Sequence, residues 1–220
     1  MLKKLKKSYA DHTDIWYLGI LVFLLIVSVL VYGFGFTALL WFTPALLAGI
    51  FAIMFLRWDE KPNIKLQIAG LIFATTFVLE IVGVNTGVLF GHYSYGSLLG
   101  FKLFGVPVII GLVWFIVTFS VWQIVLVSGL KKIYEQLVLG VMVVILFDLL
   151  LEQFAVSVGL WQWRGGHIPL LNYICWAGLS TAIFLIYKYK SPNIKPNIFS
   201  SSIVPILSIW LWLMLVAGSL

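Results

Sequence analysis

Charged residues are scarce in this sequence: only 10% of its 220 residues are Asp, Glu, Lys or Arg, whereas 62% are apolar. A water-soluble domain typically has about 25% charged and about 45–50% apolar residues. One water-soluble core could not bury this much apolar surface, and a disordered chain would be far more polar. The composition therefore excludes an ordinary soluble protein and predicts that the chain lies in a lipid bilayer.

The residues that many cofactors require are also few. A single cysteine, Cys175, excludes an intrachain disulfide and a cage of thiolate ligands for a metal. Of three histidines, His12 is expected on the opposite side of the membrane from His92 and His167, which argues against a haem or di-iron centre. The segment 201–218 has no lysine that could bind retinal, and neither a strand pattern nor a glycine-rich nucleotide motif is found. We therefore expect no cofactor and no metal site.

Long apolar runs make up most of the chain. A membrane-spanning helix needs about 20 predominantly apolar residues. Runs of this kind cover residues 15–35, 37–56, 66–89, 106–127, 136–157, 170–187 and 201–218. They predict a single all-α domain over residues 1–220, a bundle of seven transmembrane helices. Pro107 and Pro169 stand where two of these helices would begin, at a position that proline tolerates.

The basic residues predict the orientation of the bundle. Of the 14 Lys and Arg residues, only Lys102 and Arg164 fall on one side of the predicted membrane. The others are Lys3, Lys4, Lys6, Lys7, Arg57, Lys61, Lys65, Lys131, Lys132, Lys188, Lys190 and Lys195. The positive-inside rule then places the N-terminus in the cytoplasm and the C-terminus outside. We expect a multi-pass protein of the cell inner (cytoplasmic) membrane whose first span is a retained helix rather than a cleaved signal, and no nucleic-acid partner.

Three acidic residues fall inside predicted spans: Glu80 in the third, and Asp148 and Glu152 in the fifth. A carboxylate at membrane depth costs several kcal/mol, so such groups tend to be protonated, paired or functional. The i,i+4 spacing puts Asp148 and Glu152 on one helix face. All three acids fall in the outer half of their helices, so we expect them to meet at one level.

The same half of the membrane contains the other unusual residues. They are Asn85, His92, Tyr93, Tyr95, Trp114, Thr118, Trp161, Trp163, Asn172 and Trp176. In the third span, Thr76, Glu80, Gly83 and Gly87 form one stripe, where a neighbouring helix or a long ligand could approach the backbone. We interpret the three acids and these residues as one candidate site.

Structural explanations compete with this interpretation. Glu80 alone could be a hydrogen-bonded structural carboxyl, and the pair Asp148 and Glu152 could anchor Arg164 or the loop tyrosines. Trp161 and Trp163 would also fit an interfacial aromatic belt. Convergence of three acids by chance is rarer than any one of these cases, which favours a functional site.

Two blocks of sequence carry a family resemblance. The first runs from Glu80 through Gly91-His92-Tyr93-Ser94-Tyr95 to Gly105-Val106-Pro107 and Trp114. The second runs from Asp148 and Glu152 through Gly159-Leu160-Trp161-Gln162-Trp163 and Ile168-Pro169-Leu170 to Asn172-Tyr173 and Trp176. Over about residues 70–185 the chain resembles the carotenoid biosynthesis membrane-protein family, which includes CruF-type carotenoid 1,2-hydratases and bisanhydrobacterioruberin hydratases. The resemblance implies cofactor-independent addition of water to the terminal 1,2 double bond of an acyclic carotenoid, giving a tertiary alcohol.

The candidate residues fit this implied chemistry. Hydration of an alkene needs an acid that protonates the less substituted carbon, a water that attacks the tertiary cation, and a base that takes the surplus proton. We expect Asp148 or Glu80 to be the acid and Glu152 its partner. Water would be ordered by Asn85, His92, Tyr93 and Asn172. Tyr95, Trp114, Thr118, Trp161, Trp163 and Trp176 would line the slot for the polyene end.

The expected partners are membrane lipid and an acyclic carotenoid of the lycopene or gamma-carotene type, or a C50 analogue, with other carotenoid-pathway enzymes as candidates. A carotenoid cyclase remains an alternative, because it would share the protonation step and the first cation. A non-catalytic carotenoid or lipid carrier, or a small proton-coupled transporter that uses the intramembrane acids, is the alternative from another class.

Overall fold

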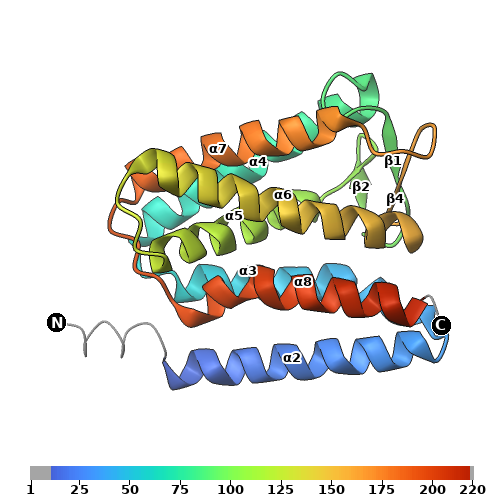
Figure 1. Cartoon of the computed structure of the whole chain (residues 1–220), viewed down its shortest axis with the longest axis horizontal. Coiled ribbons are helices and arrows are strands. Elements are labelled where there is room, and N and C mark those ends of the chain that lie inside the picture. The colour runs from blue at the N-terminus through green and yellow to red at the C-terminus, as the bar shows by residue number, and fades with distance from the viewer. Residues whose placement is uncertain (1–10, 219–220) are drawn as a thin grey trace.

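The computed structural model describes residues 11–218, and its long helices form one bundle (Figure 1). The helices are α2 (His12–Gly33), the 3-10 helix η1 (Thr37–Phe42) that leads into α3 (Thr43–Arg57), α4 (Pro62–Thr86), α5 (Ile110–Val127), α6 (Ile133–Ser157), α7 (Leu170–Lys190) and α8 (Ile198–Gly218). In the described part, seven segments are long and apolar enough to cross a membrane, with η1 and α3 counted as one. The predicted all-α polytopic fold is thereby confirmed. The orientation stays a prediction, and Lys3, Lys4, Lys6 and Lys7, which contribute to it, lie outside the described residues.

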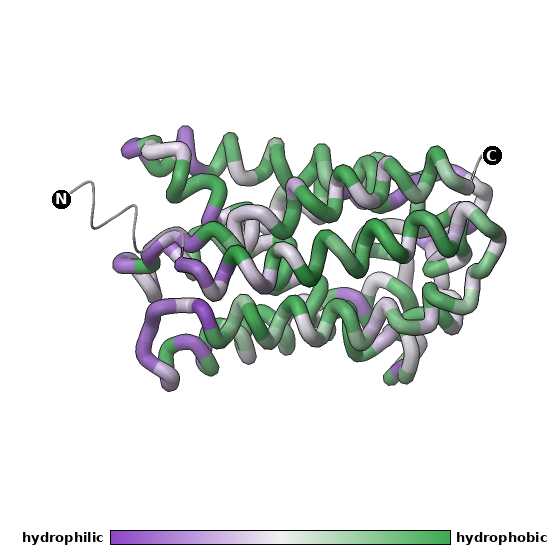
Figure 2. The backbone as a smooth tube through the Cα atoms, turned by 90° about the horizontal axis from the view of Figure 1, so that it is seen from below, coloured by the Kyte–Doolittle hydropathy of each residue, from purple (hydrophilic) through white to green (hydrophobic). Residues whose placement is uncertain are grey.

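Helix α5 occupies the centre of the bundle. Helices α3, α4, α6, α7 and α8 all pack against it, and it is buried along most of its length. Helix α2 lies at the edge, mainly against α8 (Figure 1). Most of its apolar side chains face outward, which is the arrangement expected when lipid surrounds the helix. The hydrophilic segments gather toward the two ends of the bundle, whereas its middle is apolar (Figure 2).

One end of the bundle carries short strands that the sequence did not predict. Strand β1 (Tyr93–Tyr95) pairs antiparallel with β4 (Trp161–Trp163), and β2 (Lys102–Leu103) pairs with β3 (Val106–Pro107). We call this the strand end. The expectation that Pro107 stands at the start of a helix is wrong, because Val106 and Pro107 belong to the β2–β3 hairpin and α5 begins at Ile110, four residues after the approximate start at 106. Pro169 directly precedes α7, close to its predicted place.

The α4–α5 connection folds back onto the end of α4. Gly87 ends the helix in the left-handed conformation, with φ of 69°. A Cβ atom at Gly87 would lie 2.1 Å from the His92 ring, and one at Gly83 would lie 2.8 Å from Phe90. At these two glycines of the stripe, side chains of the chain's own following loop therefore lie against the helix, in place of the neighbouring helix or long ligand expected there.

At the opposite end, charged groups tie α2 to α3. Arg57 donates hydrogen bonds to Asp14 at 2.7 Å and to Asp11 at 2.8 Å. The Arg57 guanidinium lowers the pKa of Asp11 below its ordinary value. The Asp14 side chain is fully buried, so its carboxylate depends on this partner.

Candidate active site

Glu80 is buried on α4 and accepts three hydrogen bonds. The hydroxyls of Tyr93 and Tyr95 donate to its Oε2 at 2.5 and 2.8 Å, and the indole Nε1 of Trp114 donates to Oε1 at 2.9 Å. Alternate residues of a strand point to the same face, which is why both tyrosines of β1 reach one carboxyl group. Trp114 reaches it from the first turns of α5.

Glu152, near the end of α6, is held in the same way from strand β4. The indole groups of Trp161 and Trp163 donate to its Oε2 at 2.9 and 2.8 Å, and the Asn172 amide donates to Oε1 at 3.2 Å. Because Tyr93 lies opposite Trp163 and Tyr95 opposite Trp161 in the β1–β4 pair, the two-stranded ribbon binds both glutamates. The ring centroids of these facing pairs lie 4.9 and 5.9 Å apart.

Asp148 lies one helical turn before Glu152 and is completely buried. The Asn172 amide joins the two acids, since its Nδ2 also donates to Oδ2 of Asp148 at 3.0 Å. The other oxygen of Asp148, Oδ1, has no hydrogen-bond partner among the described residues.

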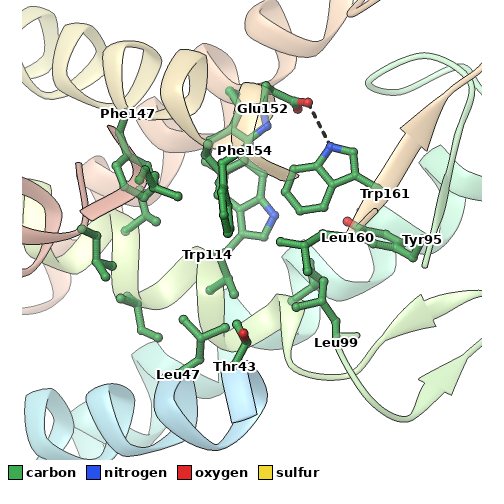
Figure 3. A pocket seen from close by; sticks show the side chains of 18 of the residues that line it. Thr43, Leu47, Tyr95, Leu99, Trp114, Phe147, Glu152, Phe154, Leu160 and Trp161 are labelled. Carbon is green, nitrogen blue, oxygen red and sulfur yellow. Dashed lines mark hydrogen bonds between the residues drawn. The ribbon is translucent and has the colours of Figure 1, made fainter. Parts of the chain in front are cut away.

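A cavity of about 110 Å³ lies between the two glutamates. By this measure one water molecule needs about 10–15 Å³, so the cavity has room for more than a single small group. Figure 3 shows Glu152 at the top of the view and Thr43 at the bottom, with Trp114 between them. Apart from Thr43, Glu80, Glu152 and Asn172, the lining side chains are aliphatic or aromatic. Trp114 and Trp176 stack in its wall with ring centroids 4.0 Å apart.

The electrostatics of the site are dominated by acids. Within residues 11–218, no Lys, Arg or His forms an ion pair with Glu80, Asp148 or Glu152. Burial and the neighbouring Glu80 raise the pKa of both Tyr93 and Tyr95 above the ordinary value, so both phenols stay neutral donors. Three acids at short range without a cation cannot all ionise at low cost. No group of His, Cys, Asp or Glu in the described part is arranged to hold a metal ion.

The cavity brings together most of the residues singled out in the sequence. Those that line it are Glu80, Tyr93, Tyr95, Trp114, Glu152, Trp161, Trp163, Asn172 and Trp176. The loop tyrosines are bound by Glu80 rather than by the acids of α6, and among the described residues the exposed Arg164 forms no ion pair with Asp148 or Glu152. The structure therefore does not support the alternative that this pair only anchors Arg164 or the tyrosines.

Four expected site residues do not line the cavity. Asn85 is exposed, and its amide donates to the carbonyls of Ile81 and Phe104. His92 is exposed at the end of α4. Thr118 is buried below the site and donates to the Trp114 carbonyl. Asp148 contacts the site through Asn172.

Other lining residues gave no chemical signal in the sequence. Leu99, Phe154, Leu160 and Trp210 are ordinary apolar residues of loops or spans that reach the cavity through long-range packing. Phe90 adopts φ of 63°, which is uncommon for a residue other than glycine. This local conformation, which places Phe90 in the wall, could not be read from the sequence.

Fold and site together define a polytopic membrane protein with buried carboxyl groups around an apolar cavity. A sequence profile of the carotenoid biosynthesis protein family matches residues 16–220, and the chain belongs to this family. A bisanhydrobacterioruberin hydratase from Haloarcula japonica is 28% identical over 153 residues, which cover 66% of this chain and 49% of that protein. The chain thus spans about half the length of this curated relative. No solved structure matches the chain significantly.

Proposed function

We propose that the protein hydrates the terminal carbon–carbon double bond of an acyclic carotenoid and releases a tertiary alcohol. The observation that carries this proposal is the pair Glu80 and Glu152, which face one apolar cavity and are each held by three hydrogen-bond donors. The hydratase activity named for the Haloarcula relative supports it. The apolar walls suit a hydrocarbon chain end.

Glu152 is the proton donor in this proposal. Its neighbour Asp148 lies one turn away on the same helix, and Asn172 holds both carboxyl groups. Because two like charges at this spacing repel in a site without a paired cation, the two acids together keep at least one proton. Glu152 lines the cavity whereas Asp148 does not, so Glu152 is the member of the pair that delivers the proton to the alkene. Asp148 and Asn172 are positioning residues.

Glu80 is the base. Two phenols and one indole N–H point at its carboxyl group, and donors of this kind stabilise a carboxylate. Glu152 also accepts three such bonds, but it shares the Asn172 amide with a second acid, Asp148, so the proton stays with that pair. A proton passes from Glu152 to the less substituted carbon, and the double bond's electron pair forms the new C–H bond. A water molecule then adds its oxygen to the tertiary cation, and Glu80 takes the surplus proton. Return of that proton to Glu152 completes the cycle, and one water has been consumed.

The aromatic walls stabilise the positive charge between these steps. Tyr93, Trp114, Trp163 and Trp176 all line the cavity, and an aromatic face attracts a cation with about 0.5–2 kcal/mol. The carboxylate of Glu80 supplies a further favourable charge, in an environment with little water to screen it.

The test is expression in a bacterium that accumulates lycopene, followed by chromatography and mass analysis of the extracted pigments. We expect products that are more polar than lycopene and heavier by one water molecule for each reacted end. A product with changed chromatographic retention but the mass of lycopene would be inconsistent with hydration. If that product were a cyclised hydrocarbon, it would identify a cyclase instead. Unchanged pigment in cells that contain the folded protein would refute both reactions and favour a carrier.

A further inference from the structure

A second cavity adjoins the site on the side of α2. It measures about 450 Å³ and is formed by α2, η1, α3 and α8. Thr43, Leu46 and Trp210 line both this cavity and the one between the glutamates. The two spaces therefore share a wall, and they lie in the same half of the bundle.

The shared wall contains a single large aromatic side chain, Trp210 of α8. Its indole N–H donates to the Ser28 hydroxyl at 2.8 Å, so the ring is fixed from the side of α2. On the other side the ring packs edge-on against Phe154, with centroids 5.2 Å apart. Phe154 itself lines the site cavity. Trp210 thus stands between the place where the chemistry is proposed and the second cavity.

The second cavity is apolar and reaches the lipid-facing surface. Apart from Ser28, Tyr32 and Thr43, its lining side chains are hydrocarbon or aromatic without a strong polar group. Phe36 and Phe42, both in its lining, are 66% and 67% exposed. A hydrophobic molecule dissolved in the bilayer could enter here without crossing water.

We propose that this second cavity binds the polyene chain of the substrate while the chain end occupies the site cavity. This inference rests on the proposed function for the identity of the ligand. An acyclic carotenoid is a long, stiff hydrocarbon, and the cavity of about 110 Å³ between the glutamates encloses only its end. The rest of the chain must leave through a wall, and the wall at Thr43, Leu46 and Trp210 leads into an apolar space of matching chemistry. Trp210 then determines how the chain turns between the two spaces.

Ala45 offers a way to fill the second cavity without touching the site. It lines the second cavity and not the first, whereas Ala48, one turn further along α3, lines neither; both alanines are exposed. Ala45→Trp therefore blocks the proposed chain site, and Ala48→Trp is the matched control. The protein, in lipid nanodiscs, is titrated with lycopene, and bound polyene is measured by the visible circular dichroism that it acquires in a chiral site.

The readout is independent of turnover, because the terminal double bond of lycopene is not conjugated with the chromophore. We expect Ala45→Trp to weaken lycopene binding by about tenfold or more and Ala48→Trp to change it by less than about twofold. Equal binding by Ala45→Trp and the wild type would overturn the proposal. Unchanged lycopene binding with a loss of co-purified phospholipid would also overturn it, and would assign the cavity to a lipid chain. Lycopene that binds in an Ala45-dependent way but is never hydrated would refute the proposed function and leave this binding site standing.

Discussion

Replacement of Glu152 by glutamine separates its chemical role from its structural one. Glutamine is nearly isosteric, and its carbonyl oxygen can still accept from Trp161 and Trp163, which both donate to one oxygen of Glu152. Its NH₂ group would then face the Asn172 amide, so one hydrogen bond is lost. Interhelical hydrogen bonds in membranes average about 0.6 kcal/mol and reach about 1.7 kcal/mol. We therefore expect Glu152→Gln to lower the unfolding temperature by only a few degrees.

The expected effect on activity is much larger. A side-chain acid contributes about 10²–10⁴-fold to the rate, which corresponds to about 3–5 kcal/mol in the activation barrier. Initial rates of lycopene conversion by purified protein in nanodiscs give this quantity directly. The matched control is Glu135→Gln in the first turn of the same helix, where the carboxylate faces Lys132 at 3.6 Å and lies far from the cavity. An exposed pair of this kind is worth about 0–1 kcal/mol, so the control should keep the wild-type rate.

The reasoning fails if Glu152→Gln retains a rate within about threefold of the wild type, since no essential proton then passes through that side chain. A rate loss that comes with a collapse of thermal stability would also contradict the reasoning. The glutamine variant loses only one hydrogen bond at this side chain, so it is expected to stay folded. The conservative variant Glu152→Asp, which keeps the acid but shortens its reach, should recover part of the activity that glutamine abolishes.

Three further outcomes follow from other contacts. Burial raises the pKa of Tyr95, so the folded state holds the phenol proton more tightly than the unfolded state does. The contribution of this group to the free energy of unfolding is therefore present below about pH 10, the ordinary pKa of tyrosine, and is lost as the pH rises above that value. Tyr95→Phe should therefore reduce the alkaline loss in a thermal unfolding series. A Cβ at Gly96 would lie 2.0 Å from the Gly159 carbonyl oxygen, so Gly96→Ala should separate β1 from β4 and abolish conversion. The same change at a glycine whose Cβ would meet no atom within 4 Å should leave conversion intact. Arg57→Met leaves the buried Asp14 without its partner and should cost about 3–5 kcal/mol of stability; adding Asp14→Asn should restore much of it, and an absence of rescue would contradict the assigned pairing.

The helices could be predicted because a bilayer imposes one simple requirement on the chain. A backbone without water must form its own hydrogen bonds over the full apolar thickness, so apolar runs of the required length identify the spans. The ends of the helices depend on local contacts instead. Helix α4 begins at Pro62 rather than residue 66, because polar residues beside the apolar run still continue the helix. Helix α5 begins late because the β2–β3 hairpin takes up the residues before it.

The site was predictable to the extent that it depends on composition at membrane depth. Glu80 and Glu152 stand out because acids are costly among apolar helices, and the structure places both at one cavity. Their hydrogen-bond donors could not be assigned, since the register of Tyr93 opposite Trp163 joins two loops far apart in the chain. A strand of three residues has too little alternation to reveal its partner.

The expectations for His92 and Asn85 show the limit of position along the chain as a guide. Both follow Glu80 in the sequence, yet Asn85 bonds to the backbone at Ile81 and Phe104, and His92 packs on the outside of the α4 terminus. The second cavity is equally hidden in the sequence, because Trp210 and Ala45 are ordinary apolar positions, and only the fold shows that α3 and α8 line one cavity.

The most direct measurement of the central claim is the origin of the atoms added to the product. Wild-type protein in nanodiscs is incubated with lycopene in deuterated water and, separately, in water that carries the heavy oxygen isotope. Acid-initiated hydration predicts one non-exchangeable deuterium on carbon and one heavy oxygen in the hydroxyl group for each reacted end, and both labels should disappear with Glu152→Gln. A product with deuterium but no heavy oxygen, or labels that persist at the wild-type rate in the glutamine variant, would contradict the account.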